Sequence, residues 1–177
     1  MSDMAENSPP SSTYAIVEIP DPVKETVERF GRPGLFVGAN DSPWIPRGPN
    51  AMIRNMAFDV RNNAYCNILW IKGPGVIGTH KHRGAVWGVG LEGSFRYLEY
   101  DWVCKPGDFI WEPPGQAHTL VTDDPNGMKT IMWMQGANEY FDAKGNWVET
   151  VDVFFFIDLY VKHCKASGLP INDALWI

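Results

Sequence analysis

The feature that most constrains the fold is a succession of short apolar or alternating runs that begins after residue 50. Turns rich in Gly, Pro, Asn and Asp separate these runs, and strand-like runs at spacings of about 8–12 residues are typical of an all-β sandwich or barrel. The expected strands cover residues 64–72, 85–91, 94–100, 108–112, 118–121, 129–134, 147–150 and 151–157. We therefore expect an all-β domain, for which a double-sheet jelly roll is one known solution.

The segments that flank these runs predict a simple organisation. Residues 1–13 are polar and rich in Ser and Pro, which indicates a disordered tail. Residues 14–50 are expected to form an N-terminal arm with one short strand and one short helix at 22–30. The domain itself is expected to span residues 51–177 and to end in a short C-terminal helix at 158–167.

Composition excludes several classes of partner. The chain has 15 Lys and Arg against 21 Asp and Glu, a net charge of −6, and no basic run, so we expect neither nucleic acid nor an anionic membrane surface as a partner. No apolar stretch approaches the roughly 18 residues of a membrane helix. Three widely spaced cysteines and an N-terminus without a hydrophobic signal core indicate a reducing, cytoplasmic location.

The histidines provide the first sign of chemistry. His80 and His82 form an H-x-H pair, and on a strand the side chains of residues i and i+2 point to the same face. Two adjacent imidazoles can chelate one metal ion. His118 follows a Pro-Pro-Gly turn that could return it to the same place, whereas His163 lies in the expected C-terminal helix. The alternative is a pair of exposed histidines on an edge strand.

The spacing around the H-x-H pair resembles the first of the two cupin motifs. In that motif a Glu follows the pair after three or four residues, and a Gly closes the motif. Here Gly93 closes the motif, but Val86 stands at the Glu position, and Trp87, at the other spacing, cannot bind a metal either.

The second cupin motif is matched over a longer stretch. Gly107, Pro113, Gly115 and His118 all fall in register, and Thr122 replaces the usual Asn. The resemblance implies the cupin fold, a double-stranded β-helix or jelly roll. It also implies a metal site with three histidines and no carboxylate, or a vestigial site.

Further stretches are similar to the 2,4'-dihydroxyacetophenone dioxygenase family and, more distantly, to acetylacetone dioxygenase, which also uses three histidines. The similar stretches are residues 41–46, 93–102 and 111–120. This resemblance implies an Fe(II) dioxygenase that cleaves an aryl α-hydroxyketone with O₂ into an aryl carboxylate and formate. Three histidine ligands would leave three octahedral positions open for a bidentate substrate and O₂.

Each of the remaining candidate site residues has two possible roles. Glu112, six positions before His118, could hydrogen-bond a ligand imidazole or accept the substrate proton. Arg96 could offset substrate charge or pair with Glu99 or Glu112. Trp87, Trp111 and Tyr97 could bind an aryl substrate or belong to an aromatic core, and Arg96 and Tyr97 point to opposite faces of one strand.

Other functions stay open at this level. The chain could be a β-diketone-cleaving dioxygenase, a non-redox isomerase or lyase, or a non-catalytic cupin that holds a metal or a small ligand. Histidines also bind zinc and other divalent metals, so Fe(II) follows only from the resemblance. The expected partners are a small aromatic ketone and O₂. The Pro- and Trp-rich segment 41–50 indicates a homo-oligomer, a dimer or a tetramer.

Overall fold

The computed structural model describes residues 15, 17–18 and 20–177, and its chain divides into two compact units, Met1–Gly34 and Leu35–Ile177. The described part of the first unit holds one helix, α1 (Lys24–Phe30), which buries no side chain. The carboxylate of Asp21 accepts a hydrogen bond from the backbone N–H of Val23 at the start of this helix. The expected disordered tail, 1–13, lies outside the described residues.

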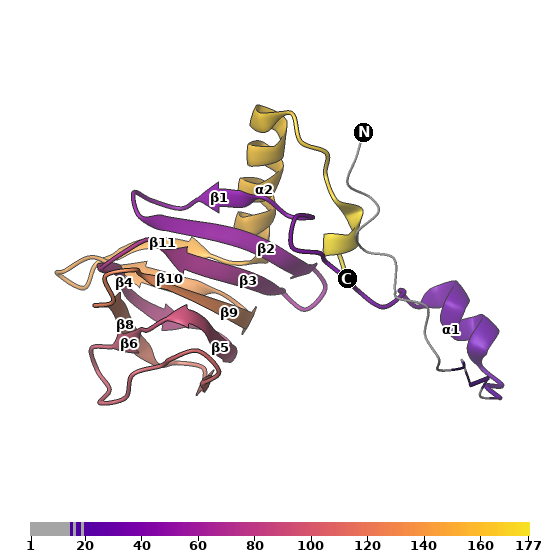
Figure 1. Cartoon of the computed structure of the whole chain (residues 1–177), viewed down its shortest axis with the longest axis horizontal. Coiled ribbons are helices and arrows are strands. Elements are labelled where there is room, and N and C mark those ends of the chain that lie inside the picture. Colours follow the sequence, from indigo (N-terminus) through magenta and orange to yellow (C-terminus); the bar gives the residue numbers. More distant parts are fainter. Residues whose placement is uncertain (1–14, 16, 19) are drawn as a thin grey trace. The chain divides into compact units, whose positions relative to one another are not determined.

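The second unit is built on two antiparallel sheets, and the expected jelly roll with a C-terminal helix is confirmed (Figure 1). The six-stranded sheet has the order β1 (Trp44–Pro46), β2 (Ala51–Asp59), β3 (Ala64–Ile71), β9 (Met128–Gln135), β5 (Val86–Gly93) and β7 (Phe109–Glu112). The five-stranded sheet has the order β11 (Trp147–Val151), β10 (Asn138–Phe141), β4 (Gly75–His82), β8 (Ala117–Thr122) and β6 (Arg96–Tyr97).

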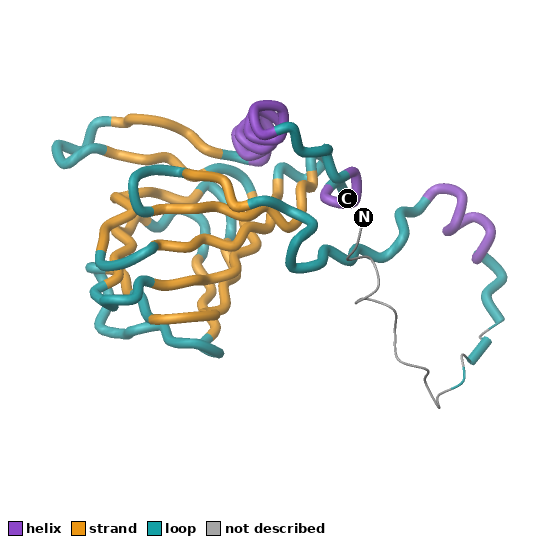
Figure 2. The backbone as a smooth tube through the Cα atoms, turned by 45° about the horizontal axis from the view of Figure 1, so that its top comes forward, coloured by secondary structure: helices purple, strands orange, loops and turns teal. Residues whose placement is uncertain are grey.

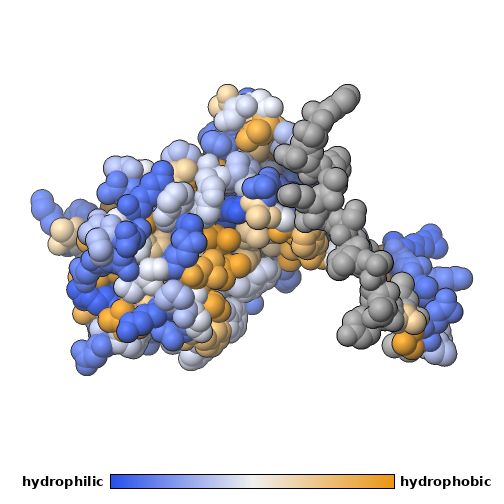
Figure 3. Space-filling view, in the orientation of Figure 1, coloured by the Kyte–Doolittle hydropathy of each residue, from blue (hydrophilic) through white to orange (hydrophobic). Residues whose placement is uncertain are grey.

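The core of this unit follows from the alternation of side chains along the strands. In β9, Met128, Thr130, Met132 and Met134 are buried while the residues between them are only half-buried. Side chains two apart share one face of a sheet, so these four point into the interior. The surface seen in Figure 3 is a mixture of hydrophilic residues with smaller hydrophobic areas between them.

One expected strand is wrong. Of residues 151–157, only Val151 belongs to a strand, and residues 153–157 begin the helix α2 (Val153–Ser167). The Asp152 side chain caps this helix by accepting a hydrogen bond of 3.0 Å from the N–H of Phe155. A run of five apolar residues does not reveal its period, and the helical spacing becomes visible only with the following residues. The buried positions of α2 are Val153, Phe156, Tyr160 and Cys164.

Helix α2 packs beside β1, β2 and β11, at one end of the strands (Figure 2). The short 3₁₀ helix η1 (Asp173–Leu175) follows it and lies against β2, where the N–H of Ile177 donates a hydrogen bond to the carbonyl of Phe58. In the part of the chain that the structure describes, no helix has the length and apolar character needed to cross a membrane.

Three strands are absent from the expected ranges, β2, β4 and β10, although the H-x-H pair of β4 was treated as lying on a strand. Strand β2 carries buried polar residues, Arg54 and Asn55, and its pairing with β3 is irregular between Asn55 and Ala57, so it lacks a clear apolar alternation. Strand β10 has only four residues. Conversely, the expected strand at 94–100 is reduced to the two residues of β6.

Candidate metal centre

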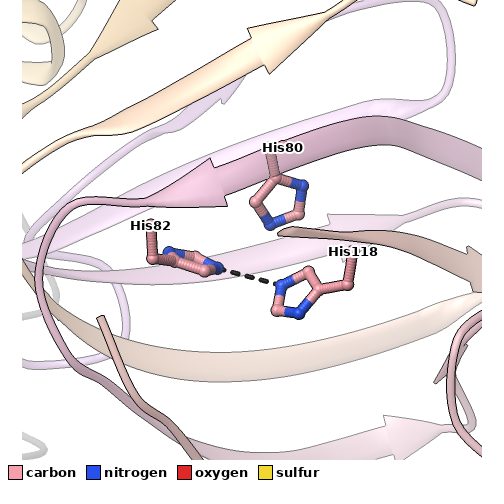
Figure 4. Close-up of side chains that lie close together, drawn as sticks. All are labelled: His80, His82 and His118. Carbon is pink, nitrogen blue, oxygen red and sulfur yellow. Dashed lines mark hydrogen bonds between the residues drawn. The ribbon is translucent and has the colours of Figure 1, made fainter. Parts of the chain in front are cut away.

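The three histidines of the motifs lie together inside the second unit. His80 and His82 share one face of β4, and His118 on the neighbouring strand β8 pairs directly with His80. All three are buried, and one ligating atom from each lies within 4.8 Å of the others. The imidazoles turn toward one another from the two strands (Figure 4). The structure thus brings together the three residues expected to bind a metal.

Strand β10 orients two of these imidazoles. It lies beside β4, with Asn138 opposite His82 and Tyr140 opposite His80. The Nδ1 atom of His82 lies 2.7 Å from the Oδ1 atom of Asn138. An amide oxygen only accepts hydrogen bonds, so His82 Nδ1 carries a hydrogen, and in the neutral imidazole Nε2 keeps its lone pair. No motif indicated this role of Asn138, since β10 itself was not expected.

The spacing of the nitrogens fits a metal ion. The Nε2 atoms of His82 and His118 are 3.0 Å apart. Two ligands at right angles, each bonded at about 2.1 Å, are also about 3.0 Å apart. The remaining imidazole, His80, has its Nδ1 atom 3.2 Å from the carbonyl oxygen of Gly78, which leaves its Nε2 atom available. These donors match the imidazole ligands that Zn, Cu, Fe and Ni prefer.

The environment keeps His80 neutral. Burial, followed by the adjacent His82 and His118, lowers the pKa of His80 from 6.5 to about 3. A neutral imidazole is the form that binds a metal. The ring of Tyr140 packs beside it, with 5.2 Å between the ring centroids.

Glu112 reaches this cluster from the other sheet. Its side chain is buried, and its Oε2 atom lies 2.7 Å from His82 Nε2 and 3.3 Å from His118 Nε2. Burial acts to raise the pKa of Glu112, but the adjacent imidazoles of His118 and His82 outweigh it and hold that pKa well below its usual range. The second oxygen, Oε1, accepts a hydrogen bond from the hydroxyl of Tyr97.

The two candidates on β6 have different surroundings. Tyr97 is buried and stacks on His118. Arg96, expected as a catalytic residue, instead points to the outer face, where its Nε and Nη2 atoms lie 3.1 Å and 3.0 Å from Asp123. Because neighbouring residues of a strand face opposite sides, a buried Tyr97 places Arg96 away from the histidines.

Neither tryptophan expected to bind substrate lines the space beside the histidines. Trp87 pairs with Trp111 across β5 and β7, and Trp111 is 56% exposed. Val86, next to Trp87 in the chain, is fully buried, so alternation directs both tryptophans to the outer face of the sheet. The expected aryl-binding role of Trp87 and Trp111 is therefore not supported by their positions.

A cavity of about 150 Å³ opens beside the imidazoles of His80 and His82. A buried cavity of about this volume in another protein holds one benzene molecule. Most of its lining is aliphatic, sulfur-containing or aromatic, and the aromatic side chains come from Tyr97, Tyr140 and Phe156. Phe156 was missed because α2 was expected to begin later in the chain.

Solved structures with similar folds are described as cupins. An RmlC-like cupin protein from Ralstonia eutropha JMP134 has a TM-score of 0.76 at 26% identity, over 83% of this chain and 96% of that chain. A protein of unknown function with a cupin-like fold from the same organism has a TM-score of 0.73 at 18% identity, over 82% and 91% of the two chains. An acetylacetone dioxygenase from Acinetobacter johnsonii has a TM-score of 0.64 at 10% identity, over 85% and 99%. No protein-family model and no curated protein matches the chain.

Proposed function

We propose that this cupin is an Fe(II)-dependent dioxygenase that cleaves a carbon–carbon bond of a small aryl α-hydroxyketone, with His80, His82 and His118 as metal ligands. The observation that carries the proposal is the buried cluster of three imidazoles beside a cavity of about 150 Å³. When bound, Fe(II) would supply Lewis-acid chemistry toward the ketone and redox chemistry toward O₂.

The cavity would bind the substrate by its shape and by excluding water. Leu69, Leu120 and Met132 line it, so an aromatic ring could be buried against apolar side chains. A cavity of this volume accommodates one aromatic ring. The ketone end would then face His80 and His82, which line the same cavity.

Tyr97 and Glu112 would order the polar side of the site. The Tyr97 hydroxyl holds Glu112 Oε1, and Tyr97 also lines the cavity. Because the pKa of Glu112 is held low, the carboxylate stays ionised near neutral pH and is not a proton donor. Its negative charge offsets part of the charge of a bound cation, which favours metal binding in a buried site.

A second candidate, cleavage of a short β-diketone, follows from the same cavity. Its aliphatic lining includes Ile53, Leu69, Ile77 and Leu120, and an unbranched diketone can fill such a space as well as a ring. The two substrate classes share the need to chelate a cation through two oxygens, so the histidines do not distinguish them.

The test is oxygen uptake by the protein reconstituted anaerobically with Fe(II). 2,4'-Dihydroxyacetophenone should trigger uptake, and ¹⁸O₂ should place one labelled atom in each product acid. Uptake with acetylacetone alone would favour the second candidate. Stoichiometric metal binding without uptake on either substrate would make the chain a binding cupin and overturn the dioxygenase proposal. His118→Ala should abolish uptake, and His163→Ala, on α2, is the matched control.

A further inference from the structure

Three atoms at the site form a nearly regular triangle. The distances are 3.0 Å between the Nε2 atoms of His82 and His118, 2.7 Å from His82 Nε2 to Glu112 Oε2, and 3.3 Å from His118 Nε2 to Glu112 Oε2. Three ligands on one face of an octahedron, each bonded at about 2.1 Å, are about 3.0 Å apart. The triangle therefore has the size of such a face.

In the neutral tautomer of His82, no hydrogen lies between its Nε2 atom and Glu112. His82 carries its hydrogen on Nδ1, which faces the amide oxygen of Asn138, so its Nε2 atom has a lone pair rather than a hydrogen to offer. Glu112 Oε2 is buried and has no hydrogen-bond partner among the described residues. Two buried acceptor atoms 2.7 Å apart are stabilised by a cation that is bound to both of them.

The position of Glu112 in the sheet independently places its carboxylate near the histidines. On β5, Val86 stands where the resemblance to the cupin motif leads one to expect a carboxylate, and Val86 pairs directly with Glu112 on β7. Directly opposite residues of an antiparallel pair lie on the same face with Cβ atoms about 4.5–5.5 Å apart. A carboxylate at position 112 therefore enters the same interior region as one at position 86.

We propose that Glu112 is a fourth protein ligand of the metal and binds it through Oε2. The proposal rests on the metal binding put forward above but not on the dioxygenase reaction. Tyr97 is a positioning residue, because its hydrogen bond to Oε1 leaves Oε2 turned toward the histidines. Four protein ligands leave two octahedral positions open, one fewer than three histidines alone, and the carboxylate offsets part of the cation's charge.

The decisive measurement is the crystal structure or X-ray absorption spectrum of the full chain loaded with Zn(II). The inference expects Glu112 Oε2 at about 2.0–2.2 Å from the metal. An oxygen beyond about 3 Å, with only the histidines bound, would overturn it. Neither result depends on oxygen uptake, so the inference can stand if the iron protein is inactive, and it can fall if the iron protein turns over.

Affinity measurements give a second readout, by competition for Zn(II) with a chromophoric chelator. Glu112→Gln should weaken binding by more than the roughly 10–100-fold typical of losing a group outside the ligand set. Exchanging the pair, Val86→Glu with Glu112→Val, should restore most of the affinity that Glu112→Val alone loses, because the carboxylate returns from the opposite strand. An exchange variant that folds but binds no better than Glu112→Val would count against the inference. Glu139→Gln, which removes a surface partner of Arg83, is the control.

Discussion

Tyr97 stacks face to face on His118, with 3.8 Å between the ring centroids and 10° between the planes, while its hydroxyl donates a hydrogen bond to Glu112. One side chain thus fixes both an imidazole from β8 and a carboxylate from β7. The two sheets meet at the site through this residue, and the two contacts can be separated by mutation.

Tyr97→Phe should keep the stacking and lose the hydrogen bond. A buried oxygen left without its partner costs about 1–3 kcal/mol of unfolding free energy, and metal affinity should fall by about tenfold. Denaturant unfolding and chelator competition measure the two effects. Tyr100→Phe removes a hydroxyl bonded to Gln116 near the surface and should change metal affinity little. Equal losses in both variants would contradict the role given to Tyr97.

Metal removal should destabilise the wild-type protein. A ligand that binds only the folded state, at a free concentration 100-fold above its Kd, adds about 2.7 kcal/mol to the free energy of unfolding. A chelator should therefore lower the melting temperature of the zinc-loaded wild type but not that of His80→Ala or His118→Ala. A chelator response that persists in both variants would place the metal elsewhere.

The metal-free protein should lose stability on mild acidification because of His80. Its folded pKa of about 3 lies below the unfolded value of 6.5, so between these limits the unfolded chain binds a proton that the folded chain does not. Stability therefore rises with pH through this window, by an amount on the order of a few kcal/mol. His80→Gln should flatten the dependence between about pH 4.5 and 6.5, above the range in which carboxylates titrate. The measurement is the denaturant midpoint of both proteins across this pH range. A slope in His80→Gln equal to that of the wild type would contradict the prediction.

Filling the cavity should separate substrate binding from metal binding. Leu69→Trp adds an indole to a space of about 150 Å³, so the iron protein should lose oxygen uptake while Zn(II) affinity changes little. Leu98→Trp, at an exposed position, is the matched control. Retained uptake in Leu69→Trp would mean that the substrate binds outside this cavity.

A homo-oligomer remains a prediction. The end strand β7 exposes Phe109 and Trp111 on one face, at 64% and 56%, and paired exposed rings of this kind favour association. Light scattering at micromolar concentration should give at least twice the chain mass of 19.9 kDa. Trp111→Glu should shift the protein toward the monomer, and a monomeric wild type would refute the prediction.

The sequence predicted the three histidines because their motifs are local. An H-x-H pair on a strand places two imidazoles on one face, and the Pro-x-Gly turn five residues before His118 sits in a fixed spacing. The same information could not orient Trp111 or show that Asn138 holds His82, because these depend on pairing between strands far apart in the sequence. Arg96 and Tyr97 could be placed on opposite faces of one strand, but not assigned to the inner or the outer face, because alternation does not tell which face is buried.

The way β4 is held between β8 and β10 has a consequence for when the protein acquires its metal. His80 and His82 have neighbours on both sides only after Asn138, roughly 60 residues later in the chain, has been synthesised and has paired with β4. At about 5–20 residues per second, that delay is at least about 3–12 s during synthesis. The complete site, with Asn138 beside His82, is therefore available to metal ions only in a chain that has been made to at least residue 138.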